Sequence, residues 1–248
     1  MYGRLVARAT DPSPTIHVET PPRPAIQTGS VPETCLAAGA QLGERDGRVV
    51  VALYGSTPGE IAVCMTHVGL ADRSDLGTLE LRGPQTALDR AFSARLGDPT
   101  IAPGSARRQR GIWYLRMEPR RALVVAGHAA LAALAPIGVG SDRAELRGRD
   151  VGATIAMISV IGPRALRLLS AAALPGDLQI GAIGRDATDA HVVAILRESQ
   201  RRVLILVRAP AVDAVWGRLL EAGEPLGAAF VGCDALSLLG AASAQAPV

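Results

Sequence analysis

Lysine is absent from the 248-residue chain, and all 26 positively charged side chains are arginine. A chain without lysine cannot form a lysine Schiff base, and it lacks the lysine that Walker A loops and protein kinases place on nucleotide phosphates. The sequence therefore excludes pyridoxal-phosphate enzymes, ordinary P-loop ATPases and protein kinases.

Cysteine and net charge are also scarce. Cys35, Cys64 and Cys233 are odd in number and far apart, which is typical of unpaired thiols in a reducing compartment and predicts a cytoplasmic location. The formal net charge of +3 is a mild bias, so we predict no nucleic-acid partner and interpret the short arginine runs as solvated turns.

Long apolar runs are equally rare. The segment from Ala122 to Ser141 carries no charged residue, but Pro136 and several glycines interrupt it. This pattern favours a buried strand followed by a short helix that ends at Pro136, and it predicts no membrane span. The first 30 residues are rich in proline, contain no apolar core of signal-peptide length, and are interpreted as a tail.

An internal repeat organises the remaining chain. Thr78–Phe92 matches Met157–Ala171, and in both segments an apolar strand ends in Gly-Pro before a helix begins. Glycine permits a sharp turn out of the strand, and we expect the proline to take the first helical position. In the second copy, Ala165, Leu168 and Leu169 begin a stripe with helical spacing that Ala172 completes.

Each Gly-Pro segment is followed by a predicted hairpin and a second helix. The predicted strands are 111–117 with 122–126 and 192–196 with 203–207, and the predicted helices are 128–135 and 210–222. The prediction is an α+β fold of two β-α-β-β-α pseudo-repeats, offset by about 80 residues, with antiparallel sheets, helices on one face and a central pocket. We divide the chain into a tail (1–30), a folded body (31–240, with units at about 70–140 and 150–232) and a short tail (241–248).

The segment VGLADRSDLGTLELRGP at Val68–Pro84 resembles the aminomethyltransferase superfamily, the folate-binding fold of the glycine cleavage T-protein. The resemblance extends over most of the chain, from Gly39 to about Gly240. It implies a tetrahydrofolate-type pocket between the halves, used in the family to transfer or oxidise one-carbon units carried on an amine.

The catalytic positions of that family differ here. Tyr114 and Leu115 stand where the T-protein has two aspartates, so Tyr114 is the candidate catalytic residue, although a phenol cannot supply a carboxylate's charge near neutral pH. The family's later acidic segment is Ser199–Leu204 here, and Glu198 is the nearby carboxylate that could replace it. The family's C-terminal barrel has no counterpart in the sequence, which makes the chain similar in extent to the gamma subunit of heterotetrameric sarcosine oxidase.

Further candidate ligand-binding residues come from the same segments. Asp72, Arg73 and Ser74 are either a turn in which polar side chains cap local amides or the edge of the pocket. Tyr54 and Trp113 are candidates for lining the same cavity, because the chain has only two Trp, three Tyr and two Phe. No metal site is predicted, and Cys64 and His67 are interpreted as helix packing, because a zinc site needs about four ligands.

Two functions of different class remain open. The first is a diverged aminomethyltransferase-type protein that binds tetrahydrofolate or a related flat molecule in one-carbon or methylamine metabolism. The second is a non-catalytic subunit of a sarcosine-oxidase-like flavoprotein complex, with a larger flavoprotein or a second copy of the chain as partner. Recruitment of the pocket for another small molecule is a third alternative, because a fold does not determine a function.

Overall fold

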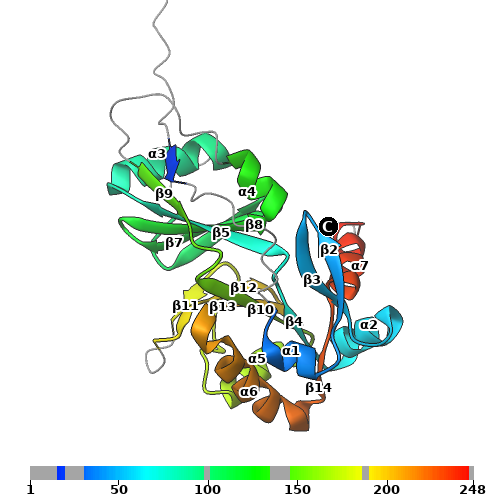
Figure 1. The fold of residues 1–248 in the computed structure, drawn as a ribbon. Helices are drawn as coiled ribbons and strands as arrows, with labels where there is room; N and C mark the ends of the chain where they lie inside the picture. Colours follow the sequence, from blue (N-terminus) through cyan, green and yellow to red (C-terminus); the bar gives the residue numbers. More distant parts are fainter. Residues whose placement is uncertain (1–15, 20–30, 98–100, 135–145, 186–189, 246–248) are drawn as a thin grey trace, which may run out of the picture.

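The structure is a computed structural model, and it describes residues 16–19, 31–97, 101–134, 146–185 and 190–245. The described strands form two six-stranded sheets and one two-stranded hairpin (Figure 1). Sheet 1 consists, in spatial order, of β1 (Ile16–Glu19), β9 (Leu146–Asp150), β5 (Leu76–Arg82), β8 (Arg121–Gly127), β7 (Ile112–Glu118) and β6 (Ser105–Gln109). Sheet 2 consists of β11 (Ile183–Gly184), β12 (Val192–Ser199), β13 (Arg202–Arg208), β10 (Ile155–Ile161), β4 (Val68–Asp72) and β14 (Ala228–Phe230).

The remaining elements are a hairpin and the helices. The hairpin pairs β2 (Gln41–Arg45) with β3 (Arg48–Leu53). The helices are α1 (Glu33–Ala37), α2 (Thr57–Thr66), α3 (Gln85–Leu96), α4 (His128–Leu134), α5 (Ala165–Ala171), α6 (Val212–Gly223) and α7 (Cys233–Gln245). No helix among the described residues has the length and apolarity that crossing a membrane requires.

The two predicted repeat units are present, and they exchange their leading strands. Strand β4 directly precedes β5 in the chain, yet it pairs with β10 of the other sheet. Strand β9 directly precedes β10, yet it pairs with β5. Because each unit contributes one strand to the sheet of the other, neither sheet can be completed without both units.

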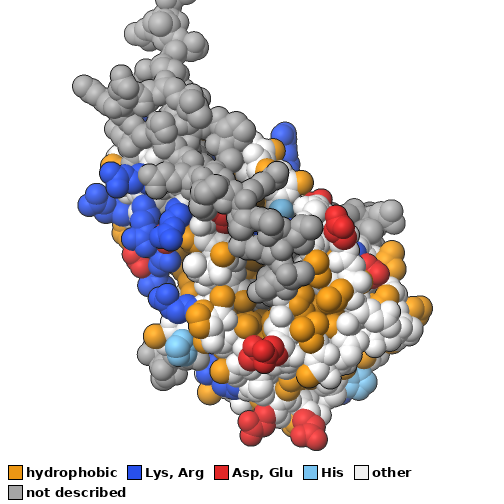
Figure 2. All heavy atoms as spheres, in the orientation of Figure 1, with side chains coloured by type: hydrophobic (Ala, Val, Ile, Leu, Met, Phe, Trp, Pro, Cys, Tyr) orange, Lys and Arg blue, Asp and Glu red, His pale blue; other side chains and the backbone are white. Residues whose placement is uncertain are grey.

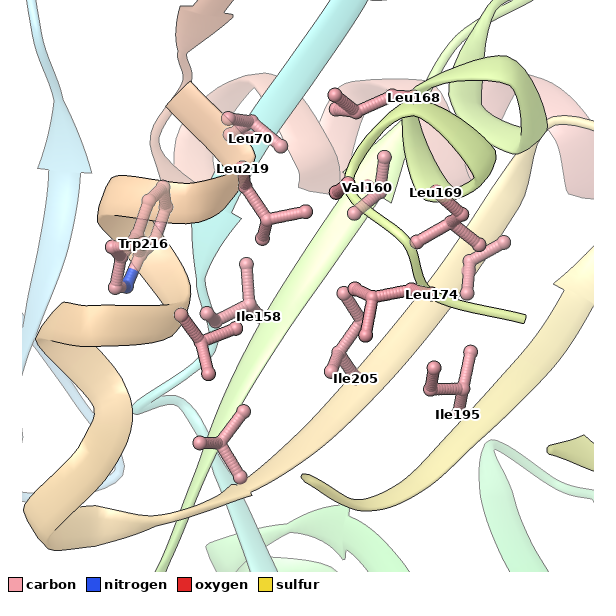
Figure 3. Packing of buried hydrophobic residues seen from close by; sticks show 14 of the residues in the cluster. Leu70, Ile158, Val160, Leu168, Leu169, Leu174, Ile195, Ile205, Trp216 and Leu219 are labelled. Atoms are coloured by element: carbon pink, nitrogen blue, oxygen red, sulfur yellow. The ribbon is translucent and has the colours of Figure 1, made fainter. Parts of the chain in front are cut away.

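The two sheets pack face to face, with helices on their outer faces. Between the sheets, Leu115 and Leu123 of sheet 1 meet Leu204 and Leu206 of sheet 2 in one apolar cluster. Helix α3 covers the outer face of sheet 1, and helices α5 and α6 cover that of sheet 2. Figure 3 shows this second outer layer, in which Trp216, Leu219, Leu168 and Leu169 point from the helices toward strands β10, β13 and β12.

The predicted hairpins and helical stripes are confirmed. β7 pairs with β8 and β12 with β13, both antiparallel. In α5 the stripe of Ala165, Leu168, Leu169 and Ala172 is at most 3% exposed. Cys64 is buried on α2, where it packs against β4, as its interpretation as a packing residue predicts.

The prediction for the two prolines is wrong by one to two residues. Pro84 is the N-cap of α3, and Pro163 precedes Arg164, the N-cap of α5, so neither occupies the first helical turn. The reason is the extended backbone that Pro84 keeps, with ψ of 146°, as it leaves the strand. The glycine is required in the second turn, since Gly162 has φ of +132° and a Cβ there would lie 2.2 Å from a backbone oxygen.

Several sequence predictions concern the chain ends. Within the predicted tail, β1 is ordered as an edge strand parallel to β9, while the other residues of the tail and the expected helix stop at Pro136 lie outside the described residues. Helix α7 continues to Gln245, through most of the segment predicted as a short C-terminal tail.

One buried carboxylate, that of Glu60, links the end of the β2–β3 hairpin to the rest of the fold. Glu60 on α2, only 6% exposed, accepts hydrogen bonds from the backbone N–H of Tyr54 at 2.6 Å and of Gly232 at 2.7 Å. Gly232 lies so close to β3 that a Cβ there would be 2.0 Å from the carbonyl oxygen of Ala52. These two hydrogen bonds join the end of β3, helix α2 and the start of α7.

Candidate functional site

The structure divides the predicted site residues into three neighbourhoods. Strand residues alternate between the two faces of a sheet, so neighbours in sequence point in opposite directions. Asp72 pairs with Ile158, which packs under the helices of sheet 2, whereas Arg73 bonds to Ser159, the next residue of β10. Asp72 and Arg73 therefore face opposite sides of sheet 2.

Trp113 and Glu198 meet between the two sheets. The indole Nε1 of Trp113 on β7 donates a hydrogen bond of 2.7 Å to Glu198 Oε1 on β12, across 85 residues of sequence. Glu198 Oε2 forms an ion pair of 2.9 Å with Arg202 Nε, and the Glu198 side chain is 9% exposed. Burial lowers the pKa of Arg202, and the carboxylate of Glu198 opposes that shift. Oε1 is thus hydrogen-bonded, whereas Oε2 has an ion-pair partner but no hydrogen bond.

Arg73 is held in a fixed orientation. Its Nε and one terminal nitrogen donate to the two carboxylate oxygens of Asp75 at 2.8 and 2.9 Å, and its other terminal nitrogen donates to Ser159 Oγ at 3.1 Å. Burial opposes the charge of Arg73, but the carboxylate of Asp75 outweighs it and the pKa of Arg73 is raised; Glu198 contributes in the same direction.

These groups form one electrostatic unit, which we call the polar centre: Trp113, Glu198, Arg202, Arg73 and Asp75. Burial opposes the ionisation of Asp75, yet the neighbouring guanidiniums, Arg73 foremost, hold the pKa of its carboxyl below the usual value. Two guanidiniums face two carboxylates inside the centre. A third, that of Arg108, lies 5.9 Å from the centroid of the Trp113 ring and adds positive charge at the indole.

Asp72, Ser74 and Tyr54 lie at the end of β4. The backbone N–H of Ser74 donates to Asp72 Oδ2 at 3.2 Å, which confirms the turn that the sequence left as one of two alternatives. Burial raises the pKa of the Asp72 carboxyl to about 6, and the residue is 3% exposed. A carboxyl that titrates there can accept or donate a proton near neutral pH. The buried Ser74 hydroxyl lies beside this carboxyl and partly offsets the rise of its pKa.

Tyr54 belongs to an aromatic stack on the outer side of sheet 2. Its ring centroid lies 5.0 Å from that of Phe230, which in turn stacks on Trp216 at 5.3 Å. Burial raises the pKa of Tyr54, and burial also raises the pKa of the neighbouring Cys35 thiol to about 12, so this thiol is no nucleophile. Tyr54 and Trp113 belong to different clusters, and the structure does not bring them together.

Tyr114 lies on the outer face of sheet 1. It packs edge-on against Phe92 of α3 with a centroid distance of 5.6 Å, it is 6% exposed, and burial raises the pKa of its phenol. Its neighbour Trp113 points to the opposite face, into the polar centre. Tyr114 packs in the apolar cluster under α3, whereas Trp113 packs in the cluster between the sheets. The catalytic role of Tyr114 stays a prediction.

A separate groove lies where the edges of the two sheets meet. Its volume is about 370 Å³, and it is lined by Ile101, Ala102, Ser105, Ala106, Arg107 and residues 179–182. Within the groove, Ala106 N–H donates to the carbonyl oxygen of Gly181 at 2.6 Å, so backbone atoms from the two sides of the groove are in contact. In the described part of the chain, no cluster of three or more His, Cys, Asp or Glu side chains could hold a metal ion.

Sequence reasoning missed Asp75 and Arg202, which complete the polar centre, and Ser159, which accepts a hydrogen bond from Arg73. Asp75 was visible as the second acid of the Asp-Arg-Ser-Asp run, and a fork with Arg73 two residues earlier is within reach of both side chains. Arg202 lies four residues after Glu198, on the other side of a tight turn. The sequence alone does not show that their side chains meet across the strand pair.

Of three comparisons with known proteins, the search of solved structures found similar folds. A scan against protein-family models found no match, and a search of curated proteins found none. Aminomethyltransferase T of the glycine cleavage system from Bartonella henselae has a TM-score of 0.66 and 21% identity over 82% of this chain and 58% of that one. A chain of heterotetrameric sarcosine oxidase from Corynebacterium sp. U-96 has a TM-score of 0.53 and 20% identity over 71% of this chain and 97% of that one.

The predicted α+β fold of the aminomethyltransferase type is therefore confirmed. The chain spans less than two thirds of aminomethyltransferase T, 58% of its length, but nearly the whole of the sarcosine oxidase chain.

Proposed function

We propose that the protein binds a flat, anionic small molecule of the tetrahydrofolate class at the polar centre, in one-carbon or methylamine metabolism. One observation carries the proposal: the hydrogen bond of 2.7 Å between Trp113 of sheet 1 and Glu198 of sheet 2. It places the indole beside Glu198 and its ion-pair partner, the guanidinium of Arg202, between the two sheets. Folds made of two such layers commonly bind ligands at the junction.

The residues fit such a ligand in three respects. The guanidinium of Arg108 suits a ligand carboxylate, since a guanidinium can pair with a carboxylate through two parallel hydrogen bonds, whereas Arg73 and Arg202 are already paired with Asp75 and Glu198. The indole of Trp113 suits the flat ring by stacking. Glu198 Oε2 and Arg202 Nε are buried atoms at the centre that form an ion pair but have no hydrogen-bond partner, which is the kind of group that a ligand satisfies.

The centre also sets a limit on the chemistry. Oε1 of Glu198 already accepts from Trp113 Nε1, so Oε2, ion-paired with Arg202 but without a hydrogen bond, is the oxygen left for a ligand. Asp72, which titrates at about pH 6, is the group able to exchange a proton at the end of β4. The proposal thus gives this chain ligand binding at the polar centre, and Tyr114, on the opposite face of β7, is outside that site.

Calorimetric titration with 5-formyltetrahydrofolate tests the proposal. We expect micromolar binding by the wild-type protein and a loss of at least tenfold for Trp113→Ala. The variant Tyr114→Phe, which removes only a hydroxyl in the opposite face of β7, should bind as the wild type does. Absence of heat with the wild-type protein, or equal affinity of Trp113→Ala, would contradict the ligand site. A saturated site should also raise the unfolding free energy by about 2.7 kcal/mol at 100 times Kd.

A second candidate function is a non-catalytic subunit of a flavoprotein complex. The specific observation is the match to 97% of a chain from a heterotetrameric oxidase. Native mass spectrometry of the protein purified from its own cells at low salt tests this candidate. Co-purification with a flavin-containing chain would support it, and a monodisperse monomer would count against it.

A further inference from the structure

One end of strands β9, β5 and β8 in sheet 1 carries a row of like charges. Strand pairing places Arg82 directly opposite Arg147 of β9 on one side and Arg121 of β8 on the other. In the next row, Glu80 lies opposite Arg149. Directly opposite residues of an antiparallel pair share a face of the sheet. We call Arg82, Arg121, Arg147 and Arg149 the arginine face.

The arginine face points away from helix α3. Leu79 and Leu81 pack under α3, so Glu80 and Arg82, which alternate with them, point to the other side. The Arg82 side chain is 65% exposed, and Arg147 and Arg149 are exposed too. In Figure 2 the blue side chains gather on the side of the molecule where Figure 1 places β7 and β9.

Two carboxylates lie beside this row: Glu80 within it, and Glu118, which lies opposite Arg121 and pairs with Arg185. Glu80, whose side chain is 10% exposed, forms ion pairs with Arg82 Nε at 3.0 Å and Arg121 Nε at 2.6 Å. Burial opposes its ionisation, but the two guanidiniums lower the pKa of the carboxyl. Arg147 and Arg149 have no ion pair within the described part of the chain. Like charges directly opposite each other destabilise a pair of strands, so the row lowers the stability of the isolated chain.

We propose that the arginine face docks a carboxylate-rich surface of a partner protein. Neighbouring strands lie about 4.8 Å apart, so three arginines in a row extend over roughly 10 Å, which is longer than one carboxylate or phosphate and fits a series of anionic groups. The face contains no aromatic side chain on which nucleic-acid bases could stack, which favours an acidic protein over a single strand. Partner carboxylates would supply the counter-charges that Arg147 and Arg149 lack.

This surface is separate from the ligand site. Both lie on the face of sheet 1 that is turned toward sheet 2, but Glu198 and Trp113 are buried between the sheets, whereas the arginine face is exposed on β5 and β9. The inference goes beyond the proposed ligand binding, and it gives the second candidate function a physical contact surface. Failure of folate binding would leave it unaffected.

Fluorescence anisotropy with a labelled poly-L-glutamate peptide of about 20 residues tests the proposal. We expect wild-type binding at low salt that weakens steeply as salt screens it, and roughly fivefold weaker binding by the double variant Arg147→Gln/Arg149→Gln, which leaves the ion pairs of Glu80 in place. The control Arg48→Gln/Arg167→Gln removes the same charge from exposed positions elsewhere and should bind at least threefold more tightly than the face variant.

A thermal melt separates docking from a structural role. Because the face variant relieves repulsion, its unfolding midpoint should stay the same or rise, while its peptide binding falls. Equal peptide binding by the face variant and the control would overturn the proposal. So would tighter binding of a single-stranded oligonucleotide of equal charge that depends on the same arginines, since that result would assign the face to nucleic acid.

Discussion

The hydrogen bond between Trp113 and Glu198 should make a measurable contribution to the joint between the sheets. Trp113→Phe removes the Nε1 donor and keeps an aromatic ring, whereas Glu198→Gln removes the charge and keeps the shape. A hydrogen bond to a charged group contributes about 1.5–3 kcal/mol. Glu198→Gln also deprives Arg202, whose side chain is 25% exposed, of its counter-ion, which should cost about 2–3 kcal/mol after allowance for solvent.

A double-mutant cycle isolates the bond from these other losses. Urea unfolding of the wild type, both single variants and the double variant should give a coupling energy of about 2 kcal/mol. The control cycle combines Trp113→Phe with Glu224→Gln, an exposed acid near the end of α6, and should be additive. A coupling below about 0.5 kcal/mol for Trp113 with Glu198 would refute the reasoning that this bond holds the two sheets at the polar centre.

Three further changes test other parts of the structure. Glu60→Ala leaves two buried backbone N–H groups without an acceptor and should lower the unfolding free energy by about 2–5 kcal/mol in urea titrations. The pKa of Asp72 is raised from 3.8 to about 6, so its contribution to stability is greatest below pH 3.8 and is lost as the pH rises through 6, by roughly 2 kcal/mol between pH 4 and pH 7; Asp72→Asn should remove this part of the pH dependence in unfolding curves measured across the range. Gly232→Ala would place a Cβ 2.0 Å from a carbonyl oxygen and should lower the unfolding free energy by about 2–3 kcal/mol. The control Gly217→Ala, on the open face of α6, should instead raise the unfolding free energy by about 0.5–1 kcal/mol and raise the melting temperature.

The repeat units could be predicted from the sequence because their signals are local. The Gly-Pro turns, the hairpins around short polar turns and the stripe of α5 each depend on residues within about 15 positions of one another. The exchange of β4 and β9 between the sheets could not be predicted in the same way. The strand pairs β4–β10 and β5–β9 join residues about 70 to 90 positions apart, and nothing in the alternation of Val68–Asp72 distinguishes one partner sheet from the other.

The candidate site was predicted in part. Trp113 and Glu198 were both chosen from the sequence, but their contact depends on how two sheets stack, which short-range patterns do not encode. Trp113 and Tyr114 are adjacent and both aromatic, so the sequence does not show which one faces the neighbouring sheet. Because a strand turns successive side chains to opposite faces, a difference of one residue separates the polar centre from the apolar layer under α3.

Tryptophan fluorescence during titration with 5-formyltetrahydrofolate tests most directly whether the polar centre holds the ligand. The chain has two tryptophans, and Trp216 is fully buried under sheet 2, away from the centre. After correction for ligand absorption, we predict saturable quenching in the wild type at micromolar ligand and none in Trp113→Phe. Unchanged fluorescence in the wild type, or equal quenching in the variant, would contradict ligand binding at the polar centre.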